Sequence, residues 1–184
     1  DKTLRQALTY AINKNESPEE RANGPISPNS WAYNPQVKQY TFDIARAKEL
    51  LGEQSSENAI NITLTTTPAL LPVADKVAKD WANIGVNTTV QVSSTIPDNF
   101  QAFLAIYNIP SDPDQYSTWH STQIGGGNVA NYQNPRIDKL LEDGRLVLDK
   151  EERKKIYLDF QRFLLEDAPT IFLYHPISYT VSRK

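Results

Sequence analysis

The strongest constraint on the fold is a strand, a helix and a second strand that follow one another along the chain. Ile60–Thr66 and Val86–Val92 alternate apolar and polar residues and are rich in β-branched side chains, a pattern typical of strands. Residues 70–83 between them carry apolar side chains at helical spacing. A connection of this length permits a right-handed parallel crossover. The sequence therefore predicts a βαβ unit in an α/β fold, with Phe103–Tyr107 as a third, central strand of the sheet.

Helix boundary signals recur outside this unit. Residues 3–13 carry an apolar stripe at helical spacing. Three side chains stand in the N-cap position just before an apolar-periodic segment: Asp43, Asn134 and Asp149. Gly52 and Pro169 are placed to end two of these helices, and the stripe that follows Asn134 includes Leu148.

Two regions have no helical pattern. Residues 15–39 are rich in Pro, Asn, Ser and Gly, which predicts an irregular but ordered arm. Thr170–Tyr174 and Tyr179–Val181 resemble two short strands on either side of His175. The 184 residues as a whole fit one ordinary domain with a sizeable core.

Composition excludes several classes of function. A formal net charge of −3, with both signs interspersed, provides no basic surface for nucleic acid. The absence of cysteine excludes disulfides and thiolate chemistry. His120 and His175 lie far apart and lack helical pair spacing, so the sequence predicts no metal site and no cofactor. No apolar run approaches the roughly 20 residues that span a bilayer.

The most distinctive local sequence is Asp112-Pro-Asp114. Two carboxylates at this spacing could serve acid–base chemistry or bind a cation. The preferred interpretation is structural: Asp112 is an N-cap, Pro113 takes the first helical position, and Gln115 completes a capping box.

A second cluster contains Trp119 and His120, followed by a loop of three glycines that ends at Asn128. Aromatic, imidazole and amide groups beside a glycine loop suit a pocket that recognises both polar and apolar parts of a ligand. The competing interpretation makes Trp119 a core residue and His120 a structural histidine. A serine hydrolase would need His120 beside Ser117 or Ser121, but neither serine lies in a nucleophile-elbow motif.

An ordered set of segments resembles the second large lobe of the family 5 solute-binding proteins of ABC importers, which include oligopeptide-, dipeptide- and nickel-binding proteins. The segments that carry the resemblance are Leu4–Asn13, Tyr40–Asp43, Ala47–Leu51, Trp81–Val86, Asp112–Asp114, Asn131–Leu141, Arg153–Gln161 and Asp167–Ile171.

The resemblance implies a single carboxy-terminal lobe over residues 1–184, with a type II periplasmic-binding-protein-like fold and a mixed β-sheet flanked by helices. It implies binding without catalysis, a missing amino-terminal lobe, a monomeric fragment, and delivery of the ligand to a membrane permease. In the full-length protein it implies an extracytoplasmic location, either periplasmic or as a cell-surface lipoprotein.

One departure from the family bears on the ligand. Peptide binders of the family carry an aspartate four residues before the proline that matches Pro113, and its charge pairs with the peptide amino terminus. This chain has Ile109 there. Tyr107 and Asn108 match pocket-lining positions of the family, whereas Trp119, His120 and Asn128 are added from the composition and position of the second cluster. The expected ligand contacts are therefore Tyr107, Asn108, Ile109, Trp119, His120 and Asn128. Peptide is the leading ligand, and an oligosaccharide or a metal chelate is the alternative. A module that binds only a membrane partner is a third possibility.

Overall fold

A computed structural model of the protein describes residues 1–16, 20–52, 59–177 and 181–182. The chain divides into two compact units, and each unit is made from two separate segments. Unit 1 comprises Asp1–Asn13 and Tyr40–Asn108. Unit 2 comprises Lys14–Gln39 and Ile109–Lys184. The chain thus leaves unit 1 after Asn13 and returns to it at Tyr40.

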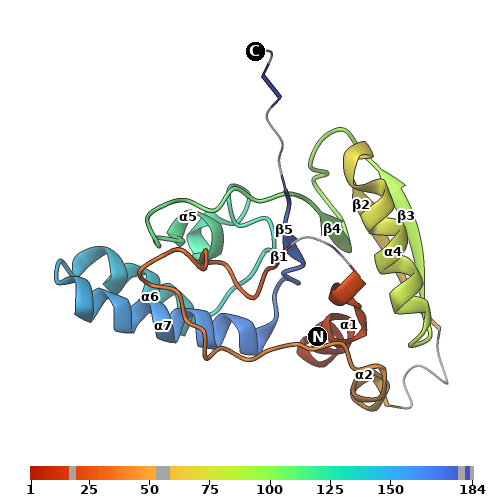
Figure 1. Ribbon diagram of the computed structural model, residues 1–184, viewed down its shortest axis with the longest axis horizontal. Helices are drawn as coiled ribbons and strands as arrows, with labels where there is room; N and C mark the ends of the chain where they lie inside the picture. Colours follow the sequence, from red (N-terminus) through yellow and green to blue (C-terminus); the bar gives the residue numbers. More distant parts are fainter. Residues whose placement is uncertain (17–19, 53–58, 178–180, 183–184) are drawn as a thin grey trace. The chain divides into compact units, whose positions relative to one another are not determined.

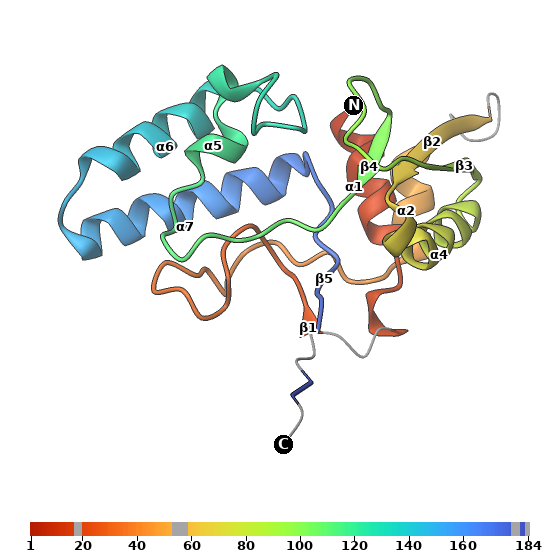
Figure 2. The same cartoon turned by 90° about the horizontal axis from the view of Figure 1, so that it is seen from above.

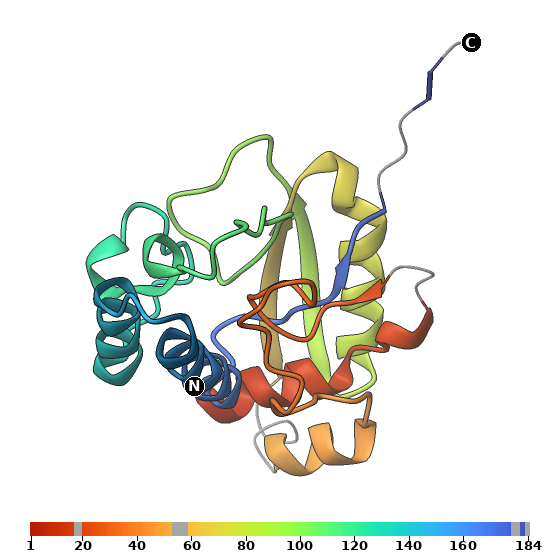
Figure 3. The ribbon, with the colours of Figure 1, turned by 60° about the vertical axis from the view of Figure 1, so that its left-hand side comes forward.

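Unit 1 contains a three-stranded sheet in the order β3-β2-β4. Its strands are β2 (Ile60–Thr66), β3 (Val86–Val92) and β4 (Ala102–Leu104). Both outer strands run parallel to β2. The connection from β2 to β3 is the short 3₁₀ turn η2 (Pro68–Leu70) and helix α4 (Leu71–Ala82), which lies along the two strands (Figure 1, Figure 3). The predicted α/β class and the parallel βαβ unit are confirmed.

The third strand differs from the prediction in length and position. β4 ends at Leu104 and lies at an edge of this sheet, not at its centre. It pairs only with Leu64–Thr66, the last three residues of β2. The apolar residues after it, Ile106 and Tyr107, are exposed. An apolar run of strand length therefore did not imply a central strand, because three of the five residues of the run lie beyond the ladder.

Two helices complete unit 1, α1 (Lys2–Ala11) and α2 (Ile44–Leu51). Asp43 caps α2 as predicted, since its side chain accepts a hydrogen bond from the backbone N–H of Arg46 at 2.8 Å. Gly52 ends the helix with a φ of 55°, in the left-handed region that favours glycine. α1 is tied to α4 by the buried indole of Trp81, which donates to the Leu8 carbonyl at 3.0 Å.

Unit 2 is built on two long helices that run side by side, α6 (Pro135–Leu146) and α7 (Lys150–Asp167) (Figure 2). Asn134 and Asp149 cap them as predicted. α6 ends before Leu148, which is 96% exposed and does not extend the apolar stripe. The buried core of the unit consists of Ile26, Ala32, Trp119, Tyr132, Ile137, Leu141, Tyr157, Phe160 and Leu164.

The described part of the arm at 15–39 forms mostly turns. It begins with η1 (Lys14–Glu16) and contains β1 (Glu20–Arg21), which pairs antiparallel with β5 (Tyr174–His175). The protein therefore contains both parallel and antiparallel strand pairs, but in separate sheets. β5 is shorter than the predicted strand at 170–174, and most of the strand predicted at 179–181 lies outside the described residues.

Candidate functional site

Tyr107 and Asn108 follow the carboxyl end of β4 in unit 1, and both are exposed. Parallel strands have their carboxyl ends at one edge of the sheet, so residues after β3 and β4 share that edge. Figure 1 shows β3 ending there beside the start of α4. Four large apolar side chains at this edge are between 46% and 60% exposed, and we call them the carboxyl-edge residues: Val92, Ile96, Ile106 and Tyr107. In open α/β sheets this edge is where ligands bind.

The capping box predicted at Asp112 is wrong. Helix α5 (Tyr116–Trp119) begins three residues after Pro113. Asp112 Oδ1 accepts a hydrogen bond from the Asp114 backbone N–H at 2.9 Å, and Asp114 Oδ1 accepts one from Tyr116 N at 2.9 Å. The two carboxylates thus make successive Asx turns ahead of the helix.

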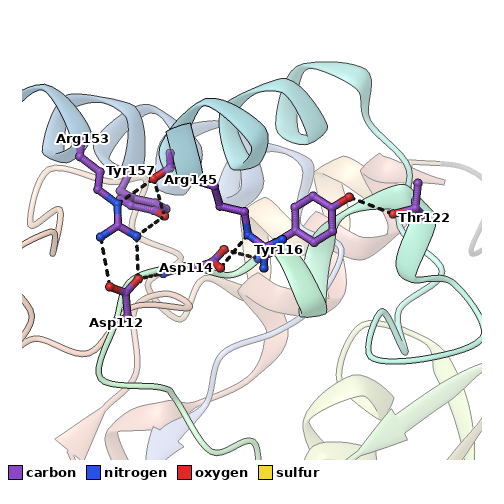
Figure 4. A network of polar contacts seen from close by, with 8 residues as sticks. Asp112, Asp114, Tyr116, Thr122, Arg145, Arg153 and Tyr157 are labelled. Carbon is purple, nitrogen blue, oxygen red and sulfur yellow. Dashed lines mark hydrogen bonds and ion pairs between the residues drawn. The ribbon is translucent and has the colours of Figure 1, made fainter. Parts of the chain in front are cut away.

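The carboxylates of this segment also bind two arginines (Figure 4). Arg153 makes a two-pronged contact with Asp112, at 2.7 and 3.1 Å. Arg145 Nε donates to Asp114 Oδ2 at 2.8 Å. These partners are 41 and 31 residues apart in sequence, so no local signal pointed to either arginine. The motif is an anchor for unit 2, with both acids already neutralised by protein cations.

Arg153 also holds the junction between α6 and α7. Its Nε donates to the carbonyl oxygen of Gly144 at 2.7 Å, and Nη2 lies 3.2 Å from the Tyr157 hydroxyl. The hydrogen bonds from Arg153 lower the pKa of Asp112. Burial is the main cause that raises the pKa of Tyr157. Gly144 is required here because a Cβ would lie 2.9 Å from the Tyr157 hydroxyl oxygen.

Tyr116 joins this anchor to His120. The Arg145 guanidinium lies 4.0 Å from the centre of the Tyr116 ring, and the His120 ring stacks on Tyr116 with centroids 4.0 Å apart. His120 itself is only 4% exposed. The predicted binding residue is therefore part of a stack of three planar groups inside unit 2.

The ring nitrogens of His120 have distinct surroundings. The backbone N–H of Thr122 donates to Nδ1 at 3.2 Å, so Nδ1 is an acceptor and the neutral ring carries its proton on Nε2. Nε2 is buried and lies 3.4 Å from the Glu142 carboxylate without forming a hydrogen bond to it. Ser121 Oγ donates instead to Asp138, at 2.5 Å. Among the described hydrogen bonds, none joins Ser117 or Ser121 to the His120 ring.

Trp119 and Asn128 are also buried. Trp119 belongs to the core of unit 2 and contacts the rings of Tyr132 and Phe172. The Asn128 amide donates to the carbonyls of His120 and Tyr132 and accepts from the Tyr132 backbone N–H. These contacts close the glycine loop onto α5. Ligand binding by Trp119, His120 and Asn128 remains a prediction, and so does binding by half-buried Ile109.

The described residues contain no group of three or more His, Asp or Glu side chains arranged to hold a metal ion. None of their helices combines the length and apolar character required to cross a membrane.

Comparison with known proteins places these features in a family. Residues 1–128 match the family model described as bacterial extracellular solute-binding proteins, family 5 Middle. The chain is 28% identical over 96% of its length to heme-binding protein A of Haemophilus influenzae, and 26% identical over its whole length to the dipeptide-binding protein of Escherichia coli. It covers 37% and 39% of those two proteins, so it spans about two-fifths of their length.

Solved structures agree with this assignment. The oligopeptide-binding protein AppA from Bacillus subtilis, in complex with a nonapeptide, superposes with a TM-score of 0.86 at 28% identity. The match covers 96% of this chain and 42% of that one. The predicted periplasmic-binding-protein-like fold is confirmed. Because the family model covers well over half of the sequence, the chain belongs to the family 5 bacterial extracellular solute-binding proteins.

Proposed function

We propose that this chain is the carboxy-terminal, ligand-binding lobe of an extracytoplasmic solute-binding protein that delivers its ligand to the permease of an ABC importer. The observation that carries the proposal is the exposed apolar edge of the sheet in unit 1, in a chain that belongs to this family. Large apolar side chains gathered at one exposed edge are typical of binding surfaces. The lobe alone is monomeric and binds ligand weakly, because closure of a second lobe supplies much of the burial.

Peptide is the proposed ligand. The relatives that support it are the Escherichia coli dipeptide-binding protein and the Bacillus subtilis protein solved with a nonapeptide. Tyr107 offers an aromatic face for apolar side chains, and Asn108 offers an amide that can both donate to and accept from a peptide backbone. Trp119, His120 and Asn128 contribute by holding in place the chain segment that follows Asn108. Ile109 cannot pair with a free amino terminus, so the peptide amine is met by another group or by water.

A metal chelate is the second candidate, and two observations favour it. One relative is a heme-binding protein, and NikZ from Campylobacter jejuni, 27% identical with a TM-score of 0.83, was solved in complex with Ni(L-His). The apolar Ile109 fits a ligand that has no ammonium group at that place. An oligosaccharide is less well supported, because the described carboxyl-edge side chains are mainly apolar.

Catalysis is not part of the proposal. A histidine base needs an acceptor nitrogen within reach of the nucleophile. The acceptor nitrogen of His120 already binds Thr122, and Ser121 is bound to Asp138. These contacts support a structural role for the only serine and histidine pair adjacent in sequence.

Tyr107→Ala tests the proposal. We would measure thermal stabilisation of the protein, extended to the length of its relatives, by peptide pools, heme and nickel–histidine. Ligand that binds the folded state raises the melting temperature. We expect peptide to do so, and Tyr107→Ala to weaken binding about tenfold through loss of aromatic burial, roughly 1.4 kcal/mol. The matched control is Phe42→Ala, an exposed aromatic of unit 1 that lies before α2 and away from the carboxyl-edge residues in sequence.

Three outcomes separate the alternatives. Stabilisation by peptide that is lost in Tyr107→Ala and kept in Phe42→Ala supports peptide binding at this edge. Stabilisation by heme or nickel–histidine alone selects the metal chelate. No response to any of these ligands contradicts the proposal, as does a response that both variants lose equally.

A further inference from the structure

Strand β3 is the longer of the two edges of the sheet in unit 1. It runs over seven residues, whereas β4, at the other edge, runs over three. Beside β4, the Gln101 side chain accepts a hydrogen bond from the Thr63 backbone N–H at 2.6 Å, so it occupies part of the ladder that β4 leaves open. β3 pairs with β2 on one side, and no strand among the described residues pairs with its other side. It therefore offers a row of backbone groups to another strand.

The sequence of β3 does nothing to protect this edge. Proteins usually protect an open edge strand with charged side chains, proline or a bulge. Val86–Val92 contains no charged residue, no proline and no glycine. Its pairing with β2 runs residue by residue without a bulge. Most of its side chains are β-branched, which favours the extended conformation that pairing requires.

The hydrogen bonds to β2 define which backbone groups of β3 face the open side. Ser93, the residue after β3, donates its N–H to the Thr66 carbonyl of β2 at 2.8 Å. Successive residues point their backbone groups to alternate sides of a strand, so the odd-numbered residues of β3 bond to β2. The even-numbered residues direct their N–H and C=O groups to the open side. The side chains of the odd-numbered residues are exposed: Asn87, Thr89 and Gln91.

The sequence of β3 is also nearly symmetrical about Thr89. When two copies of the strand pair antiparallel with Thr89 facing Thr89, each residue meets one of similar size or chemistry: Val86 with Val92, Asn87 with Gln91, and Thr88 with Val90. In this register the even-numbered residues form the hydrogen-bonded pairs, and theirs are the backbone groups that face the open side. Thr89 forms a non-hydrogen-bonded pair. Side-chain symmetry and backbone direction therefore select the same register.

We propose that β3 is a contact surface for a second copy of this chain, related by a two-fold axis at Thr89 that joins the two three-stranded sheets into one. No charge opposes this contact. The Asn87 amide donates to Asn61 at 3.2 Å and keeps its oxygen free to accept from the Gln91 amide of the second copy.

The contact is weak. One pair of strands buries less surface than a stable interface needs, so the dissociation constant is on the order of 0.1–1 mM and the lobe stays monomeric in dilute solution. The contact shares only Val92 with the carboxyl-edge residues and needs no solute. This proposal and the proposed function can therefore fail separately.

Thr89→Cys tests the register directly, because the chain has no other cysteine. Non-hydrogen-bonded antiparallel partners have Cα atoms about 4.5 Å apart, within the range that a disulfide spans. We expect this variant, concentrated and mildly oxidised, to form a covalent dimer on a non-reducing gel. The matched control is Asn87→Cys, also exposed on β3, whose two Cα atoms would be about 13 Å apart in the paired form. Equal cross-linking of the two variants, or none of Thr89→Cys, overturns the proposal.

Sedimentation equilibrium tests the same contact without a covalent bond. Thr89→Lys places two like charges directly opposite each other across the axis and should weaken the dimer about fivefold. Asn87→Lys combined with Gln91→Glu places opposite charges together on each side of the axis and should strengthen it about fivefold. A dimer that neither change affects uses another surface and contradicts the proposal. An unchanged chain that stays monomeric at about 1 mM also contradicts it.

Discussion

Replacing Arg153 by Met tests whether the charged anchor of unit 2 stabilises the fold. The substitution retains an apolar stem against Tyr157 and removes the guanidinium. Its contact with Asp112 is worth only about 0.5–1 kcal/mol, because the carboxylate side chain is 57% exposed to water. Its contact with the Gly144 carbonyl is worth more. Losing that charged donor from a partly buried oxygen costs about 1–2 kcal/mol.

The expected total for Arg153→Met is therefore about 1.5–3 kcal/mol, against about 0.5–1 kcal/mol for Asp112→Asn. Urea unfolding followed by tryptophan fluorescence would measure both, with the denaturant slope unchanged. The double mutant isolates the coupling energy between the two side chains, which should be about 0.5–1 kcal/mol, the value given for the ion pair. Arg162→Met is the matched control, since the Arg162 ion pair joins it to Asp159 one turn earlier on an exposed face of α7.

The pH dependence has a definite direction. The folded-state pKa of Asp112 lies below its unfolded value, so the carboxylate contributes stability above that unfolded value. The difference in stability between the wild type and Asp112→Asn should be constant near neutral pH and should shrink as the pH falls below about 4. Equal losses for Asp112→Asn and Arg153→Met would refute the reasoning, because they would assign the stabilisation to the ion pair and not to the Gly144 contact.

Three further substitutions test the loop that follows α5, all by urea unfolding. Gly127→Ala should destabilise the protein by at least about 2 kcal/mol, because a Cβ would lie 2.2 Å from the Ser117 carbonyl oxygen. Gly126→Ala, whose Cβ would meet its nearest neighbour at 3.4 Å, should cost less than about 1 kcal/mol, and equal costs would contradict the clash. Asn128→Ala should cost about 2–4 kcal/mol because it removes the hydrogen bonds of the buried amide with the backbone C=O and N–H of Tyr132. A loss below about 0.5 kcal/mol would show that water replaces the amide.

The helices and strands that depend on residues close together in the sequence could be predicted from it. Asp43, Asn134 and Asp149 each cap a helix because the capping contact joins residues two or three positions apart. The βαβ unit could be predicted because strand alternation and helical spacing are properties of short windows. Leu148 was misassigned because an apolar residue at the right spacing does not show where the helix ends.

The acidic motif could not be interpreted locally. Capping preferences describe a competition between a side chain and the first turn of one helix. In this protein Asp112 and Asp114 are also bound by Arg153 and Arg145, which are brought to them by the pairing of α6 and α7. The Asx turns of these two carboxylates lie ahead of Tyr116, where α5 begins, and the arginines that bind them lie outside any short window of sequence.

The same limitation applies to the predicted ligand contacts. An aromatic residue in a core and an aromatic residue on a binding surface are chemically identical, and they differ only in what covers them. Trp119 is covered by Tyr132 and Phe172, and Asn128 is fully engaged with backbone groups. Tyr107 keeps 47% of its surface exposed beyond the last paired residue of β4. A protein that captures a solute must leave apolar surface uncovered until the solute arrives, so among the six predicted contacts exposure argues most strongly for Tyr107.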